Sequence, residues 1–249
     1  MEKKEINKQF GLLGKHIDYS FSRGFFAEKF KKENLLGHDY KNYDLPNIEA
    51  VKPLLKEPNL AGLNVTIPYK KEIIDYLDDL SVEAREIGAV NTLIFQKDGS
   101  VLGANTDCFG FEKALKQRIK KTPEKALILG TGGAAAAIEY VLKKNKINYQ
   151  FVSRKPKHGQ LSYANLHQNG FEDSALIINT TPVGTFPNVS AAPDLPYYNL
   201  NKKHILFDLI YNPKQTTFLK HGAQKGATTI NGYSMLVYQA EKAWELWNS

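Results

Sequence analysis

The sequence Ala126-Leu127-Ile128-Leu129-Gly130-Thr131-Gly132-Gly133 begins the second half of this 249-residue chain and indicates how that half folds. Its four apolar residues predict a buried strand, and the glycine turn leads at once into a helix expected over Ala134–Lys144. Glycines let the backbone turn sharply and approach a pyrophosphate, whose charge is stabilised at the helix N-terminus. Strand, glycine turn and helix in this order predict a Rossmann-like dinucleotide-binding unit. The glycines alone would also be consistent with an ordinary tight turn.

The end of the next expected strand, Ile147–Val152, indicates which dinucleotide binds. An acidic residue about 20 positions beyond the glycines would bind the ribose 2′-hydroxyl of NAD. Instead, Ser153, Arg154 and Lys155 stand there. A guanidinium and an ammonium group suit a 2′-phosphate, so the sequence favours NADP. The alternative is that the basic pair only decorates a loop.

The segment after Lys155 is short. The next expected strand, Gln160–Tyr163, follows after a few residues, whereas a parallel crossover usually needs a dozen or more. We therefore expect either that one crossover helix is missing or that the strand order is altered. The remaining elements are expected to be strands at Ala175–Ile178, His204–Ile210 and Thr228–Ile230 and a last helix at Tyr233–Trp247.

The first hundred residues alternate strand and helix signals, which predicts an α/β domain with a mainly parallel sheet. The expected elements are a strand at Gln9–Leu13, a helix capped by Ser22, a strand at Tyr40–Leu45, a helix at Ile48–Leu55, a strand at Leu63–Ile67, helices at Glu72–Leu77 and Val82–Ile87, and a hairpin of Val90–Phe95 with Val101–Leu102. We expect one domain at 1–106, with helix 233–249 packing back on it, a second domain at 107–232, and a cleft between them.

One polar stretch of the first domain, Asn64-Val65-Thr66-Ile67-Pro68-Tyr69-Lys70, is typical of a binding site. In an extended strand Asn64 and Thr66 share one face, while Val65 and Ile67 point into the core. Helical spacing after the proline places Lys70 in the first turn of a helix, where a cation is unfavourable by about 0.3–1 kcal/mol. Either Lys70 is a solvated lysine, or it is a general acid/base beside two hydroxyl-binding side chains.

A carboxylate that could orient this amine lies in Gly103-Ala104-Asn105-Thr106-Asp107, which closes the hairpin and opens a helix. Asp107 would lie near the helix start, where capping explains an aspartate equally well. Asn91 is another polar residue at a strand edge and could be a turn residue. Gln239 lies on the apolar stripe of the last helix and marks either the helix edge or a ligand contact.

Composition excludes several classes of protein. Hydrophobic residues make up 42% and charged residues 24%, as in ordinary globular proteins. The net charge of +7 permits anionic partners, but the lysines lie on solvated helix faces without an RNA-binding motif, so we expect small anions and no nucleic acid. The only cysteine, Cys108, excludes an internal disulfide, and six histidines without ligand spacing predict no metal. Met1–Glu5 begins no apolar segment, so we expect a cytoplasmic protein with no membrane partner.

Several separated motifs together resemble the shikimate dehydrogenase family along nearly the whole chain. The resembling stretches are Gly11–Ser22, Asn64–Lys70, Gly88–Thr92, Gly103–Asp107, Gly130–Ala134, Ile178–Thr181, Phe207–Tyr211 and Asn231–Gln239. Departures from the family pattern are Tyr19, where histidine is common, Arg23, where proline is common, and Ser153, where asparagine is usual. The shortened segment after Lys155 is a further departure.

The resemblance implies reversible reduction of 3-dehydroshikimate to shikimate by NADPH in aromatic amino acid biosynthesis, with Lys70 and Asp107 as the acid–base pair. It implies a first domain that binds substrate through Ser20, Ser22, Asn64, Thr66, Asn91, Tyr211 and Gln239. It implies cofactor contacts from Gly130, Thr131, Gly132, Gly133, Ala134, Ser153, Arg154, Lys155, Thr180, Leu209 and Gly232. The retained Ser22 favours shikimate over quinate. Broader quinate/shikimate specificity, a non-catalytic NADP- or ligand-sensing homologue, a folate-linked dehydrogenase and a homodimer stay open.

Overall fold

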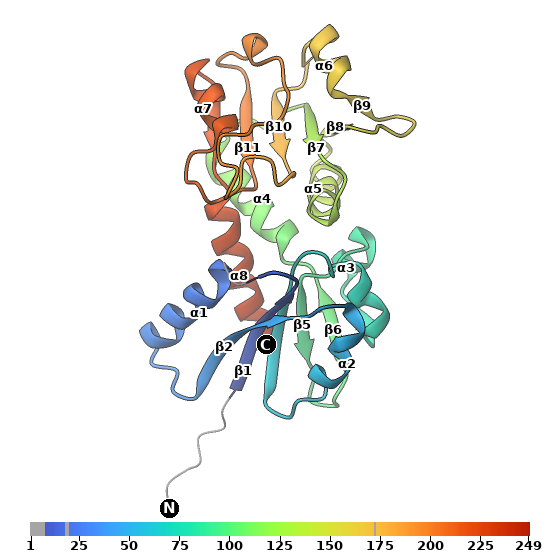
Figure 1. Ribbon diagram of the computed structural model, residues 1–249, viewed down its shortest axis with the longest axis vertical. Helices are drawn as coiled ribbons and strands as arrows, with labels where there is room; N and C mark the ends of the chain where they lie inside the picture. The colour runs from blue at the N-terminus through green and yellow to red at the C-terminus, as the bar shows by residue number, and fades with distance from the viewer. Residues whose placement is uncertain (1–7, 18–19, 172) are drawn as a thin grey trace, which may run out of the picture. The chain divides into compact units, whose positions relative to one another are not determined.

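The computed structural model describes residues 8–17, 20–171 and 173–249 and falls into two compact units (Figure 1). The first unit comprises Met1–Thr106 and Ala240–Ser249, and the second comprises Asp107–Gln239. The N-terminal stretch Met1–Glu5 and Tyr19, on which two of the sequence-based expectations fall, lie outside the described residues. Each unit contains its own six-stranded sheet, so the expected α/β class is confirmed.

The first sheet has the strand order β2-β1-β3-β5-β6-β4. The strands are β1 (Lys8–Gly14), β2 (His38–Asp44), β3 (Leu60–Val65), β4 (Asp79–Leu80), β5 (Thr92–Phe95) and β6 (Val101–Ala104). Strand β1 pairs in parallel with β2 and β3, as β4 does with β6. The expected hairpin of β5 and β6 is confirmed, and it makes the sheet mixed because β5 pairs antiparallel with both β3 and β6.

The local structure of this unit differs from the sequence-based expectations at three places: the cap of the first helix, Ile67 and Lys70. The helical segments are α1 (Phe21–Lys32), η1 (Ile48–Ala50), α2 (Val51–Leu54), η2 (Glu72–Tyr76) and α3 (Val82–Ile87). Helix α1 is capped by Ser20, whose Oγ accepts a hydrogen bond from the Ser22 N–H at 3.1 Å, and Ser22 itself lies buried inside the helix. Ile67 is 72% exposed rather than in the core, because β3 has already ended and strand alternation no longer applies. Lys70 precedes a five-residue 3₁₀ helix instead of lying in the first turn of an α-helix.

The last ten residues pack on the first sheet through two tryptophans. Phe10 on β1 contacts the rings of Trp244 and Trp247, with centroid separations of 5.5 and 5.0 Å. The Trp247 indole N–H donates to the Leu93 carbonyl at 2.9 Å. A Cβ at Gly62 would come within 2.5 Å of the Trp247 ring, so this glycine makes room for it. Helix α8 (Tyr233–Trp247) is therefore divided, with its end in the first unit and its start in the second.

The second sheet is parallel throughout, in the order β12-β11-β10-β7-β8-β9. The strands are β7 (Lys125–Leu129), β8 (Asn148–Ser153), β9 (Leu161–Ser162), β10 (Leu176–Asn179), β11 (Ile205–Asp208) and β12 (Thr228–Ile230). Read from β9, this is the Rossmann order 3-2-1-4-5-6. Residues 154–160, all of them described, form no helix between β8 and β9. The missing crossover helix is thus confirmed, and the strand order is kept.

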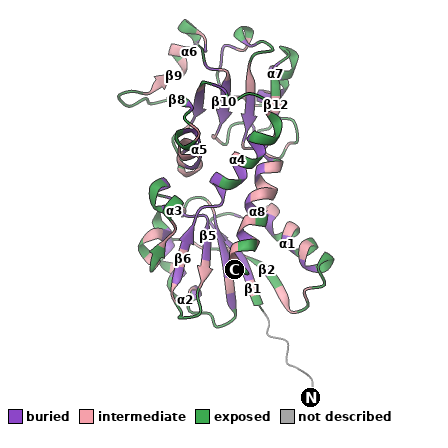
Figure 2. Cartoon of the chain, turned by 180° about the vertical axis from the view of Figure 1, so that it is seen from behind, coloured by how far each residue is buried: buried purple, intermediate pink, exposed green. Residues whose placement is uncertain are grey.

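The helices of the second unit cover a sheet whose central strands, β7 and β10, are buried except for Lys125. They are α4 (Asp107–Arg118), α5 (Gly133–Lys144), α6 (Tyr163–Asn169), η3 (Tyr197–Asn199), α7 (Thr217–Gln224) and the first part of α8. Figure 2 shows the buried strands in purple and exposed residues gathered on the outer faces of the helices. Strand β7 is apolar from Ala126 to Leu129, and Ala137, Ile138 and Val141 lie on the buried face of α5. This packing fixes the glycine turn between β7 and α5 at the carboxyl edge of the sheet.

Candidate active site

Five buried polar residues of the first unit form one hydrogen-bonded group, called here the amide–hydroxyl cluster: Tyr40, Asn64, Asn91, Thr92 and Thr106. The Asn64 amide donates to the Asn91 carbonyl at 3.3 Å and to Thr92 Oγ1 at 3.4 Å. Asn91 Nδ2 donates to Thr106 Oγ1 at 3.0 Å, and Thr92 Oγ1 donates to Asn91 Oδ1 at 3.1 Å. Buried polar groups are costly unless they are bonded, so the cluster has one defined arrangement.

Tyr40 connects this cluster to Ser22 at the start of α1. Its hydroxyl donates to Asn64 Oδ1 at 2.8 Å, and its side chain is also hydrogen-bonded to Ser22. Burial raises the pKa of the Tyr40 hydroxyl far above its usual range, while the bond to Ser22 lowers it. Tyr40 therefore stays a neutral donor at any physiological pH. It aligns two residues that were expected to bind substrate.

The segments that carry Lys70 and Asp107 are hydrogen-bonded to two consecutive residues, Val90 and Asn91. The Val90 N–H donates to the Lys70 carbonyl at 2.7 Å. The Asn91 side chain accepts from the Thr106 N–H, also at 2.7 Å, directly before Asp107. Asp107 is the first residue of α4 and is buried, where a carboxylate is stabilised by the helix N-terminus.

The other expected substrate ligands are divided between the units. Ser20 and Thr66 are half-buried in the first unit, where the Thr66 N–H donates to the Leu13 carbonyl at 2.8 Å. Tyr211 is half-buried and Gln239 is buried in the second unit. The Gln239 amide donates to the Leu236 backbone carbonyl of the same helix at 3.1 Å, and its contact with a ligand stays a prediction.

The turn between β7 and α5 has the properties of a phosphate site. Gly130 has a φ of +105°, which side chains rarely adopt, and a Cβ there would lie 2.8 Å from Thr180 Oγ1. Thr131 and Gly132 are exposed, and a Cβ built at Gly132 would meet nothing within 4 Å. The first turn of α5, which begins with Gly133 and Ala134, carries no acidic residue. The open helix start can therefore accept an anion.

The end of β8 presents two exposed cations. Ser153 is the last residue of the strand, and its Oγ accepts from the Lys155 N–H at 3.2 Å. Arg154 and Lys155 are exposed, and the Arg154 charge acts against the burial that raises the pKa of Tyr163. These groups fit a 2′-phosphate, and the loop 154–160 that carries them forms no helix.

The carboxyl ends of β7, β10, β11 and β12 are held together by close backbone contacts. Thr180 donates to the Leu129 carbonyl from its N–H at 3.0 Å and from its Oγ1 at 2.6 Å. A Cβ at Gly232 would lie 2.2 Å from the Leu209 carbonyl oxygen, so only glycine fits there. Thr180, Leu209 and Gly232, all expected to contact cofactor, thus lie on a single tightly packed edge.

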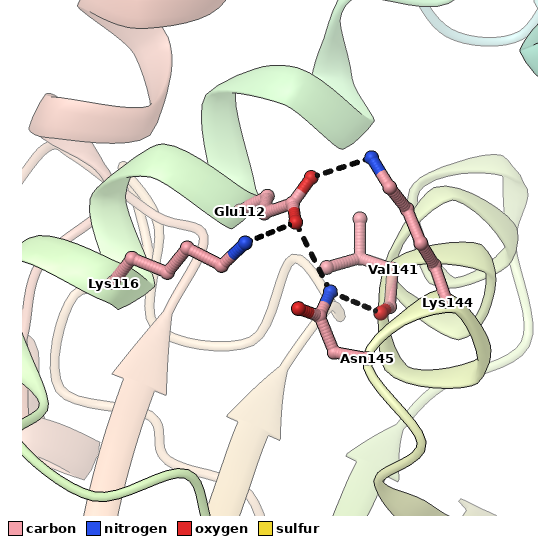
Figure 3. Close-up of polar contacts among 5 residues, drawn as sticks. All are labelled: Glu112, Lys116, Val141, Lys144 and Asn145. Carbon is pink, nitrogen blue, oxygen red and sulfur yellow. Dashed lines mark hydrogen bonds and ion pairs between the residues drawn. The ribbon is translucent and has the colours of Figure 1, made fainter.

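Helices α4 and α5 are joined through Glu112, as Figure 3 shows. Its carboxylate accepts from Lys116 Nζ at 2.6 Å, Lys144 Nζ at 3.0 Å and Asn145 Nδ2 at 3.1 Å. These bonds outweigh the opposing effect of burial and lower the pKa of Glu112 to about 2. The helix that starts with Asp107 is thereby tied to the helix that starts at the glycine turn.

Within the described residues, we find no group of three His, Cys, Asp or Glu side chains that could hold a metal ion. None of the described helices combines the length and the apolar character needed to cross a membrane.

Known proteins resemble this chain over most of its length. A family described as shikimate dehydrogenase substrate binding domain matches residues 12–93. The shikimate dehydrogenase (NADP(+)) of Methanococcus maripaludis is 37% identical and covers 96% of this chain and 91% of the relative. That of Clostridium botulinum (strain Hall) is 38% identical, with 95% of each covered. The Thermus thermophilus shikimate 5-dehydrogenase, solved with NADP(H) and shikimate, has a TM-score of 0.83 at 32% identity and covers 96% of this chain and 93% of that one.

The chain belongs to the shikimate dehydrogenase family. The resemblance suggested by the sequence is therefore confirmed, and the Rossmann-like second unit is confirmed by similarity to solved structures of the family. The roles of individual residues stay predictions.

Two features of this shikimate dehydrogenase family member were missed in the sequence. In the sequence, Tyr40 is an ordinary strand residue. Its partner Asn64 lies on β3, on the other side of β1. The signal that could have found the pair is the pairing of β1 with both strands. Asn179 and Asp208 end two buried strands, and a polar residue at that position is the signal that could have found them.

Proposed function

We propose that this chain is an NADP-dependent shikimate dehydrogenase that reversibly reduces 3-dehydroshikimate to shikimate. Relatives at 37 and 38% identity over almost the whole chain are named as NADP(+) enzymes of this kind. The main structural support for the proposal is that the segments of Lys70 and Asp107 are hydrogen-bonded to neighbouring residues of the chain. The Lys70 carbonyl and the Thr106 N–H bind consecutive residues, Val90 and Asn91, next to the amide–hydroxyl cluster.

The substrate side of the reaction uses neutral donors and acceptors. Asn64 and Asn91 bind hydroxyls of the cyclohexene ring, and Ser20, Ser22, Thr66, Tyr211 and Gln239 complete the contacts to the carboxylate and hydroxyls. Lys70 donates a proton to the alkoxide that develops at the ketone oxygen, and Asp107 orients its amine. In the reverse direction the same amine accepts the hydroxyl proton. Positioned acid–base catalysis supplies typically about 10²–10⁴-fold.

The second unit fits NADP. Bound NADPH supplies the hydride for the ketone carbon. The open start of α5 and the residues Gly130–Ala134 suit the pyrophosphate, and Arg154 and Lys155 suit the 2′-phosphate. Thr180, Leu209 and Gly232 form the edge against which the nicotinamide is held, since ligands of open α/β sheets bind outside the carboxyl ends of the strands.

Shikimate is the preferred substrate in this proposal. Ser22 is buried and bonded to Tyr40, so it is held in place for a substrate group. Quinate carries an added hydroxyl and a saturated ring. We also propose that the enzyme acts in aromatic amino acid biosynthesis in the cytoplasm, and a homodimer stays open.

The proposal is tested by following NADPH formation with shikimate and with quinate, each with NADP⁺ and with NAD⁺. We expect the highest kcat/KM for the pair shikimate and NADP⁺. Binding of NADP⁺ without turnover of either acid would instead support a ligand-sensing homologue. A higher kcat/KM for quinate would support the enzyme of broader specificity.

A further inference from the structure

Three polar residues of the second unit are completely buried among apolar neighbours. Asn179 and Asp208 are the last residues of the adjacent parallel strands β10 and β11 and are directly paired in the sheet. Thr216 is the N-cap of α7 and is equally inaccessible. Since burying such groups is costly unless each is bonded, their partners show what they hold in place.

The Asp208 carboxylate accepts hydrogen bonds from three separate segments. Oδ1 accepts from Asn179 Nδ2 at 3.0 Å and from the Ile210 N–H at 3.1 Å. Oδ2 accepts from Thr216 Oγ1. The carboxylate therefore joins the end of β10, the turn after β11 and the start of α7. An apolar side chain of the same size would leave all three donors unsatisfied.

Asn179 carries the connection into the turn after β10. Its Oδ1 accepts from the Thr181 N–H at 3.1 Å and from Thr181 Oγ1 at 2.6 Å. Its backbone carbonyl accepts from the Leu209 N–H at 3.0 Å. The turns that carry Thr180 and Leu209 are thus linked by side-chain bonds through Asp208 and by a backbone bond.

The proposed function places the nicotinamide at these two turns, and this inference rests on it. We propose that Asp208 is a positioning residue that holds both turns in the geometry required for hydride transfer. It is fully buried and acts on the cofactor only through the turns that it braces. A displacement of about 1 Å at a reacting centre can lower a rate as much as 10²-fold. The expected consequence of loosening the turns is a slower hydride step with substrate binding preserved.

The test compares the wild-type chain with Asp208→Asn, Thr216→Val and Thr216→Ser, and with Asp194→Asn as a control at an exposed aspartate of the same unit. Asp208→Asn keeps the side-chain size but turns one acceptor into a donor. For each variant we measure Tm, kcat, KM for shikimate, and the isotope effect on kcat for shikimate deuterated at the carbon that donates hydride to NADP⁺.

We expect Asp208→Asn to lower kcat by about 10-fold, to raise the isotope effect and to leave KM for shikimate within about twofold of wild type. Thr216→Val should shift kcat and the isotope effect in the same direction by less, and Thr216→Ser, which retains the hydroxyl, should restore them. Asp194→Asn should behave as wild type.

A lowered Tm with unchanged kcat and isotope effect in Asp208→Asn would overturn the inference, because the carboxylate would then only stabilise the fold. If Asp208→Asn does not fold, Thr216→Val decides, and wild-type kcat in that variant would overturn the inference. Absence of shikimate oxidation in the wild-type chain would overturn the proposed function instead, and is seen before any variant is compared.

Discussion

The two units stabilise their polar interiors by different means. The amide–hydroxyl cluster of the first unit is built from neutral groups: the Tyr40 hydroxyl donates to Asn64 at 2.8 Å, and the Asn64 amide donates to the Asn91 backbone carbonyl at 3.3 Å. The second unit places a carboxylate, Asp208, at the centre of its buried group, and burial raises the pKa of that carboxyl to about 6 even though three hydrogen bonds lower it. Side chains of a neutral cluster can replace a hydrogen bond among themselves by one to a hydroxyl group of a ligand. A buried carboxylate with three donors is a fixed brace.

This difference suggests that the first unit binds the substrate and the second binds the cofactor. Amides and hydroxyls both donate and accept, so a ring with several hydroxyls can be bound by the first unit without introducing charge. The second unit instead joins its turns by side-chain hydrogen bonds and presents two exposed cations, Arg154 and Lys155. Variants in the first unit should therefore change substrate binding or proton transfer, and variants in the second should change cofactor binding or alignment.

The largest effect is expected for Lys70→Ala. Loss of the acid–base group should lower kcat by about 10²-fold or more, while the Kd of NADP⁺ changes little because the amine acts on the substrate. Steady-state kinetics and cofactor titration by fluorescence measure both quantities. The neighbouring exposed cation offers a matched control, and Lys71→Ala should keep wild-type kcat. An unchanged kcat in Lys70→Ala would remove the catalytic role of this lysine.

The next effect concerns the cation pair of the second unit. Arg154→Ala should raise the Kd of NADP⁺ by about 10-fold, since a hydrogen bond to a charged group contributes roughly 1.5–3 kcal/mol. The Kd of NAD⁺, which lacks the 2′-phosphate, should not change. Calorimetric titration distinguishes the two cofactors, with Lys146→Ala as an exposed control on the same unit. Equal weakening of both cofactors would mean that Arg154 does not bind the 2′-phosphate.

A smaller effect is expected for Tyr40→Phe in the first unit. The Asn64 oxygen loses its donor at 2.8 Å, which should cost about 1 kcal/mol of stability and raise KM for shikimate several-fold. NADP⁺ affinity should be unaffected. Chemical denaturation and kinetics check this, with Tyr43→Phe on the same strand as the control. A change in the Kd of NADP⁺ would contradict the division between the units.

The smallest effect concerns the link between α4 and α5. The folded pKa of Glu112 is about 2, below its ordinary 4.5, so its bonds stabilise the folded state above pH 4.5. That contribution is lost as the pH falls from 4.5 towards 2. Glu112→Gln should lower Tm by about 2–4 °C at pH 7, roughly 1 kcal/mol, and the difference should shrink below pH 4.5. Thermal unfolding from pH 7 to 3 measures it, and Glu124→Gln, 89% exposed, should show no such difference. A constant difference across this range would contradict the assignment.

Much of the fold could be predicted from short-range patterns. The glycine turn after β7, the hairpin of β5 and β6 and the long helix α8 each have a local signal, and each forms as expected. The exposed Ile67 and the 3₁₀ helix after Lys70 were mispredicted because strand ends and helix type depend on neighbouring segments.

The parts of the site that were missed depend on contacts far apart in the sequence. Tyr40 on β2 reaches Asn64 on β3 because both strands pair with β1, one on each side. Asp208 meets Thr216 only because α7 begins over the end of β11. The choice between Ser20 and Ser22 as the cap of α1 likewise depends on where the loop after β1 turns, which composition does not encode.

The most direct test of this account is the initial rate of NADPH formation by the wild-type chain with shikimate, measured beside the NAD⁺ reaction. We expect a shikimate-dependent rate with a kcat/KM for NADP⁺ at least about 10-fold above that for NAD⁺, because a charged group binds the 2′-phosphate. No shikimate-dependent rate, or a preference for NAD⁺, would contradict it.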